Sequence, residues 1–142
     1  MLKQGYLAGT SVYVSTVHSE EIVNRFPSVD QVRFANSGTE ASLHATRMVK
    51  TITGRPKIAK FEGAYHGSHD ALEVSVATPL DKAGDSASPN SIGGQKGMSS
   101  SAEEDVIILP YNDIESVELI LRENKDQIAG VFYDSKLGLL DI

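Results

Sequence analysis

Three small residues in a row, Ser37, Gly38 and Thr39, form the turn with the clearest chemical potential in this sequence. They follow a β-rich run at 31–35 and precede a segment with helical periodicity that starts at Glu40. The first N–H groups of a helix have no partner within it, and the helix dipole favours an anion beside them. Gly38 lets the backbone approach a ligand closely, and the two hydroxyls add donors. The pattern predicts a phosphate-binding turn at a strand end.

A simpler interpretation of this turn is open as well. Ser37 or Thr39 can cap the helix, with Glu40 supporting its first turn, and such caps are common. A Ser-Gly-Thr triplet by itself has little specificity. The residues alone therefore leave a helix cap and an anion site as alternatives.

A second polar stretch, residues 60–70, follows another short strand and contains Tyr65 and His66 beside two glycines. An aromatic ring next to glycine-rich backbone at a strand end can stack on a planar ligand. Tyr65 is also explained as a half-buried packing residue. His66, His69 and Asp70 have helical spacing for a metal but lack a further ligand, so we expect no metal site.

Composition excludes several classes of function. The chain has 142 residues, a net charge of −6 and no cysteine. Scattered Lys and Arg argue against nucleic acid or an anionic membrane as partner, and the lack of cysteine excludes disulfides and thiol nucleophiles. No apolar run has the length of a membrane span, and no signal-peptide pattern is visible. We expect a single cytoplasmic domain over residues 1–142.

The elements that would position the polar turns alternate between helix and strand. Strand-like runs cover four segments: 31–35, 57–61, 105–109 and 128–133. Most of these runs are apolar without strict alternation, which is typical of parallel strands covered on both faces. The expected fold class is α/β, an open and mostly parallel sheet with flanking helices.

Capping residues set the expected helix boundaries. Helices are predicted over 19–26, with Ser19 as the cap, over 40–53, with Gly54 as the left-handed end, and after a cap at Asn112 or Asp113.

Residues 83–101 are rich in Ser, Gly, Pro, Asn and Asp, so they predict a long polar, flexible loop that is either functional or mobile.

Several linked motifs follow one another along the chain: Asn-Ser-Gly-Thr-Glu-Ala at 36–41, Thr-Gly-Arg at 53–55, Lys-Phe-Glu-Gly at 60–63, Tyr-His-Gly at 65–67 and Leu-Pro-Tyr-Asn-Asp at 109–113. In this order they resemble the class III pyridoxal-phosphate-dependent aminotransferase family, and within it the glutamate-1-semialdehyde 2,1-aminomutase group. The resemblance covers roughly residues 5–133 and implies a partial large domain of the fold type I transferases.

The resemblance also implies site residues. It assigns Ser37, Gly38 and Thr39 to the cofactor phosphate and Tyr65, followed by His66, to the pyridine ring. The implied cofactor is pyridoxal phosphate, and a small phosphate-bearing ligand is the expected partner. The loop at 83–101 matches a segment that lies over the active site in aminomutase-like members.

The resemblance further implies a truncated chain. Family members are about three times as long, and their Schiff-base lysine and the carboxylate on the pyridine nitrogen match no position here, so no catalytic residue is assigned and this chain alone is expected to be inactive. A partial sheet leaves unpaired strand edges, so we expect a homo-oligomer, with a dimer favoured. The alternative is a non-catalytic oligomeric interaction module on the same fold.

Overall fold

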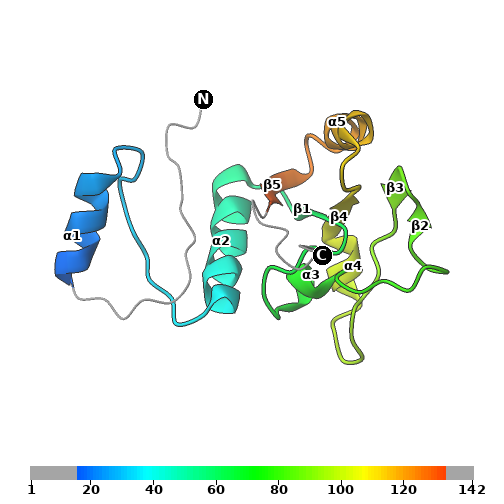
Figure 1. Cartoon of the computed structure of the whole chain (residues 1–142), viewed down its shortest axis with the longest axis horizontal. Coiled ribbons are helices and arrows are strands. Elements are labelled where there is room, and N and C mark those ends of the chain that lie inside the picture. The colour runs from blue at the N-terminus through cyan, green and yellow to red at the C-terminus, as the bar shows by residue number, and fades with distance from the viewer. Residues whose placement is uncertain (1–15, 134–142) are drawn as a thin grey trace. The chain divides into compact units, whose positions relative to one another are not determined.

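The structure, a computed structural model, describes residues 16–133 (Figure 1). The chain divides into two compact units, residues 1–45 and 46–142. Helix α2 (Gly38–Thr53) contains the boundary, so its first turns belong to the first unit and its last turns to the second. The prediction of one domain over 1–142 stays a prediction.

The described part of the first unit contains helices and connecting segments. Helix α1 (Thr16–Arg25) starts three residues before the predicted 19–26, so Ser19 lies inside the helix and the expected cap at Ser19 is wrong. The predicted strand at 31–35 is also wrong, since these residues form no strand. A strand exists through hydrogen bonds to a neighbouring strand, and the described residues of this unit contain no other strand.

The second unit is built on a three-stranded parallel sheet. Its strands are β1 (Lys57–Phe61), β4 (Val106–Leu109) and β5 (Ile128–Phe132), and their order is β4-β1-β5, with β1 in the centre (Figure 1). Ile58 pairs with Val106 on one side and with Gly130 on the other. The α/β class and the parallel sheet are confirmed, and each of these strands agrees with its prediction within one residue.

Alternate side chains of β1 point to opposite faces of the sheet, which separates two buried clusters. Ile58 belongs to one cluster with Leu72 of helix α3 (Asp70–Glu73) and with Ala102 of helix α4 (Ser101–Glu104). Its neighbour Ala59 belongs to the other cluster, against which helix α5 (Ile114–Glu123) packs. The short helices α3 and α4 have no counterpart among the predicted elements.

Local caps set the ends of the longer helices, as predicted. Helix α5 (Ile114–Glu123) begins after Asp113, whose carboxylate accepts from the Ser116 backbone N–H at 3.1 Å, so Asp113 rather than Asn112 is the cap. Gly54 ends α2 with φ +68° and donates its N–H to the Lys50 carbonyl at 2.9 Å. Glycine occupies this left-handed conformation without steric cost.

The polar segment 83–101 contains more structure than its composition indicates. It forms a short hairpin of β2 (Gly84–Asp85) and β3 (Ser88–Pro89), and its last residue begins α4. The Asn90 N–H donates to the Ala83 carbonyl at 2.8 Å within the segment, and the Ser75 N–H donates to the Ile92 carbonyl at 2.8 Å, which connects the segment to the rest of the unit. In residues 16–133, none of the helices has the length and hydropathy needed to cross a membrane.

Candidate functional site

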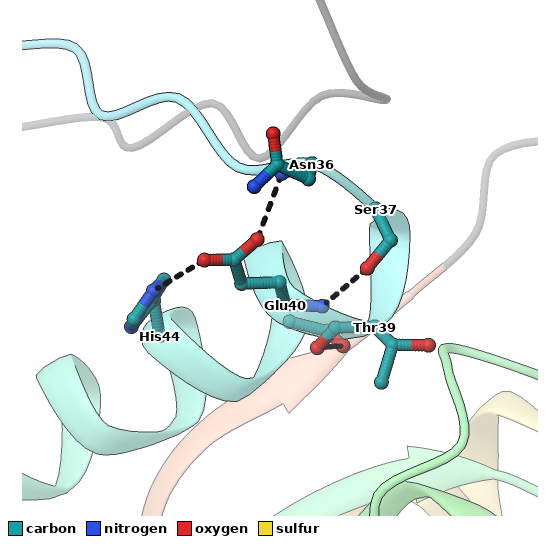
Figure 2. Close-up of polar contacts among 6 residues, drawn as sticks. Asn36, Ser37, Thr39, Glu40 and His44 are labelled. Carbon is teal, nitrogen blue, oxygen red and sulfur yellow. Dashed lines mark hydrogen bonds and ion pairs between the residues drawn. The ribbon is translucent and has the colours of Figure 1, made fainter.

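The Ser-Gly-Thr turn opens α2, where Ser37 is the residue before the first helical position (Figure 2). Its Oγ accepts a hydrogen bond from the Glu40 backbone N–H at 3.1 Å, and its carbonyl accepts from the Ala41 N–H at 3.0 Å. This is the geometry of a helix N-cap, in which a side chain satisfies one of the unpaired N–H groups. The capping interpretation of Ser37 is therefore confirmed, and the hydroxyl retains its own proton to donate.

The Glu40 carboxylate turns back over the start of the helix. Its Oε2 accepts from the Asn36 backbone N–H at 2.8 Å, and its Oε1 lies 3.6 Å from His44 Nε2. The Asn36 hydrogen bond, with His44 and Arg33 adding to it, lowers the pKa of Glu40 below its ordinary value. Figure 2 shows the carboxylate facing Asn36 and His44, while the Thr39 side chain points away from it. The negative charge of Glu40 is thus directed away from Thr39.

Space is open beside the turn. Ser37 and Gly38 are exposed, and a Cβ placed on Gly38 would have no neighbouring atom within 4 Å. Hydroxyl and backbone N–H donors at the start of a 16-residue helix are the donor set that a phosphate prefers. The residues of this turn therefore fit a phosphate group.

The second predicted stretch follows β1, in the other unit. Tyr65 is 49% exposed, and its hydroxyl shares a 2.7 Å hydrogen bond with Ser68 Oγ. The His66 ring packs beside Phe132 of β5, with 5.8 Å between the ring centroids. Gly63 makes the turn after the strand with φ +72°. This exposure allows Tyr65 either to stack on a ligand or to pack, so both interpretations stay open.

The structure places the predicted site residues in two groups. Ser37, Gly38 and Thr39 share one turn of the first unit, and Tyr65 and His66 share one loop of the second. Each group is contiguous in sequence, so motif spacing was enough to find it. Within residues 16–133, no group of three or more His, Asp or Glu side chains could hold a metal ion.

Sequence reasoning missed the role of Lys60. Its side chain is fully buried in the central strand, and its ammonium donates to the Val74 carbonyl at 2.6 Å. Burial lowers its pKa to about 8, against an opposing effect of Glu73. The signal was the alternation in β1, which places Lys60 on the same face as Ile58 rather than toward solvent.

Comparison with known proteins extends over most of the chain. Residues 8–138 match the family model described as aminotransferase class-III. The glutamate-1-semialdehyde 2,1-aminomutase of Ignicoccus hospitalis is 36% identical over 137 residues, which cover 96% of this chain and 31% of that protein. The enzyme of the same name from Methanothrix thermoacetophila is 35% identical, with 96% of this chain and 30% of that protein covered.

Solved structures agree with these sequence relationships. An omega-transaminase from Sphaerobacter thermophilus superposes with a TM-score of 0.73 at 38% identity, over 87% of this chain and 29% of that protein. A transaminase with PLP bound gives a TM-score of 0.66 at 34% identity, over 87% and 28%. The chain thus spans about 30% of the length of the relatives it matches.

Proposed function

Because the chain belongs to the class-III aminotransferase family, we propose that Ser37, Gly38 and Thr39 hold the phosphate group of pyridoxal phosphate. The observation that carries the proposal is the open space beside Gly38 at the start of α2. Backbone N–H groups and the helix dipole stabilise the phosphate charge. The Ser37 hydroxyl donates to a phosphate oxygen while its lone pair keeps the cap on Glu40. When bound, the cofactor supplies an electron sink for reactions at the α-carbon of an amino acid.

Tyr65 and His66 are proposed separately, from the family motif and from their own loop in the second unit. A half-exposed tyrosine ring offers a flat surface on which a pyridine ring can stack. The hydrogen bond between the Tyr65 and Ser68 hydroxyls fixes the outer end of the ring, and His66 is held beside Phe132. We expect Tyr65→Phe to retain cofactor binding and Tyr65→Ala to weaken it, since stacking needs the ring and not the hydroxyl.

Binding by this chain is proposed to be non-covalent. The lysine that lies deepest in the second unit, Lys60, is fully buried and already donates to the Val74 carbonyl, so an aldehyde cannot reach it. The Lys50 ammonium forms an ion pair with the Asp105 carboxylate, with 3.1 Å between Nζ and Oδ2. Borohydride reduction after cofactor addition should leave no adduct at one defined lysine, as read by peptide mass spectrometry. A single stoichiometric adduct would show that the chain is competent for covalent chemistry.

Substitutions at Ser37 test the phosphate site while preserving the helix. Asp and Asn cap helices as well as Ser does, so Ser37→Asp and Ser37→Asn retain α2. The aspartate places a negative charge where the phosphate would bind, and the asparagine does not. We expect S37D to weaken pyridoxal phosphate binding by about tenfold or more, with S37N within about threefold of the parent chain.

The measurement is a titration of pyridoxal phosphate followed by absorbance, with α-helix content followed by circular dichroism. Equal affinity in S37D and S37N, with helix content unchanged, would overturn the phosphate site. Pyridoxal without its phosphate is the ligand control, and its binding should not distinguish the two variants.

A second candidate function is an interaction module, because both outer strands of the described sheet pair on one side only. Strand β5 also exposes Val131 at 45%, and Tyr133 follows at 67%. Unpaired strand edges associate with other chains. We therefore propose a homodimer that forms through the edge strand β5. Val131→Lys should shift the chain to monomer in light scattering after gel filtration, while Leu80→Lys, at a 94% exposed position, should not. A monomeric parent chain at all concentrations would refute the dimer.

A further inference from the structure

The second unit contains a pocket that the proposed cofactor role does not use. It has a volume of about 340 Å³ and lies between segments 75–82 and 92–96. This volume falls within the range of small-molecule sites, about 300–1,000 Å³. Ser75, Thr78, Lys82 and Lys96 are among its lining residues. The pocket is formed entirely within one compact unit.

One lining residue of this pocket, the buried Ser75, is held by several hydrogen bonds. Ser75 is 1% exposed; its hydroxyl donates to the Asn90 carbonyl at 2.9 Å and accepts from the Ile92 N–H at 3.0 Å. Its backbone N–H donates to the Ile92 carbonyl, and its carbonyl accepts from the Gly63 N–H. Four hydrogen bonds to two segments, residue 63 and residues 90–92, hold Ser75 at φ +51°, a conformation that non-glycine residues rarely adopt. The two walls of the pocket are therefore held together at a rigid corner.

The charged side chains of the lining are both cationic. Lys82 and Lys96 line the pocket, and the lining contains no Asp or Glu among the described residues, in a chain of net charge −6. Two carboxylates outside the lining bind residues of it. Glu103 accepts from the Gly93 N–H at 2.6 Å, and Glu73 accepts from the Gln95 amide at 3.4 Å. Two ammonium groups in a lining that contains no Asp or Glu favour an anion, while Glu73 and Glu103 are held by their own hydrogen bonds.

One hydroxyl of the lining lacks a hydrogen-bond partner. Thr78 Oγ1 is buried and makes no hydrogen bond. Leaving a buried hydroxyl unsatisfied destabilises a fold, so such a group calls for an explanation. An oxygen of a bound anion would accept its proton, and the two lysines would balance the anion's charge.

From these observations we propose that this pocket binds a small dianion, such as a phosphate monoester or a short dicarboxylate. Lys82 and Lys96 supply the charge complement, Thr78 donates a hydrogen bond, and the Ser75 corner fixes the distance between the walls. This inference is independent of cofactor binding at Ser37.

The experiment is a titration of the full chain with inorganic phosphate at constant ionic strength, followed by amide chemical shifts. The S37D background keeps phosphate away from the α2 turn, so a failure here is separable from a failure of the cofactor site. In that background, Lys82→Ala with Lys96→Ala should weaken binding by about tenfold or more. The matched control, Arg122→Ala with Lys125→Ala, removes two exposed cations near the end of α5 and should change binding by less than about twofold.

Thr78→Val tests the contribution of the hydroxyl to anion binding apart from its effect on folding. The variant keeps the shape of the side chain, so it should raise the melting temperature of the free chain while weakening phosphate binding. A second titration uses malonate in place of phosphate. The anion class that the pocket prefers, dicarboxylate or phosphoryl, should give the larger amide chemical-shift change at Thr78 and Lys96. Absence of saturable binding of either anion, or equal weakening by the two double variants, would overturn the proposal.

Discussion

Two polar arrangements in this chain satisfy their hydrogen bonds in opposite ways. At the start of α2, the Ser37 and Glu40 bonds join residues three or four positions apart on an exposed surface. At the corner formed by Lys60, Val74 and Ser75, the side-chain bonds join residues 14 to 17 positions apart at buried or partly buried positions. The first arrangement is available to the helix as soon as it forms, whereas the second exists only when the second unit is folded. The comparison predicts that substitutions in the interior cost more than substitutions at the turn.

The largest effect is expected at the apolar contacts around the corner. Leu72 is fully buried in the cluster of Ile58 and Val74, so Leu72→Ala should destabilise the second unit by about 2–5 kcal/mol. Leu80→Ala removes the same atoms from a 94% exposed position and should cost less than about 0.5 kcal/mol. Urea unfolding gives both values. Equal costs would mean that the corner is not part of a packed core.

A pH dependence is expected from Lys60, because its pKa in the folded chain, about 8, lies below its ordinary value of 10.5. Between these values the unfolded chain binds more protons than the folded chain, so the free energy of unfolding rises with pH. The slope is about 1.4 kcal/mol per pH unit for one group. Urea unfolding from pH 7.5 to 10 should show this rise in the parent chain and a smaller slope in Lys60→Met. An identical slope in both chains would mean that Lys60 is solvated.

A smaller loss is expected from the hydroxyl at the corner. Ser75→Ala removes two buried hydrogen bonds and leaves the Asn90 carbonyl and the Ile92 N–H without this partner. The cost of such unsatisfied groups is about 1–3 kcal/mol. Ser86→Ala, at an exposed position of the hairpin, is the control and should be neutral. Amide hydrogen exchange at Ile92 should accelerate in the first variant and not in the second.

The smallest effect is expected at the exposed turn. Ser37→Ala removes the cap on the Glu40 N–H, which costs about 0.5–2 kcal/mol of helix stability. Ser37→Asn restores an acceptor and should recover most of the loss. Hydrogen exchange of the first amides of α2 measures both variants. A cost at Ser37 larger than that at Leu72 would reverse the order that the comparison predicts.

Much of the secondary structure could be predicted because its signals are local. The strand at 57–61 was predicted at its observed bounds, Gly54 was recognised as a helix end, and the cap of α5 was limited to Asn112 or Asp113 from residue type and spacing. The run at 31–35 failed because a β-rich sequence becomes a strand only beside another strand. The start of α1 was misplaced because Ser favours a cap position but is also tolerated inside a helix.

The sequence by itself determined the α/β class and the contiguous motifs at 36–41 and 65–67, and it limited the cap of α2 to Ser37 or Thr39, since each of these depends on residues within a few positions of one another. Only the tertiary structure decided that Lys60 is buried, that Ser75 joins three segments and that Lys82 and Lys96 line one pocket. The physical reason is the range of the interactions. Hydrogen bonds within a helical turn are specified by spacing, whereas burial and the satisfaction of buried groups depend on segments that meet only in the folded chain.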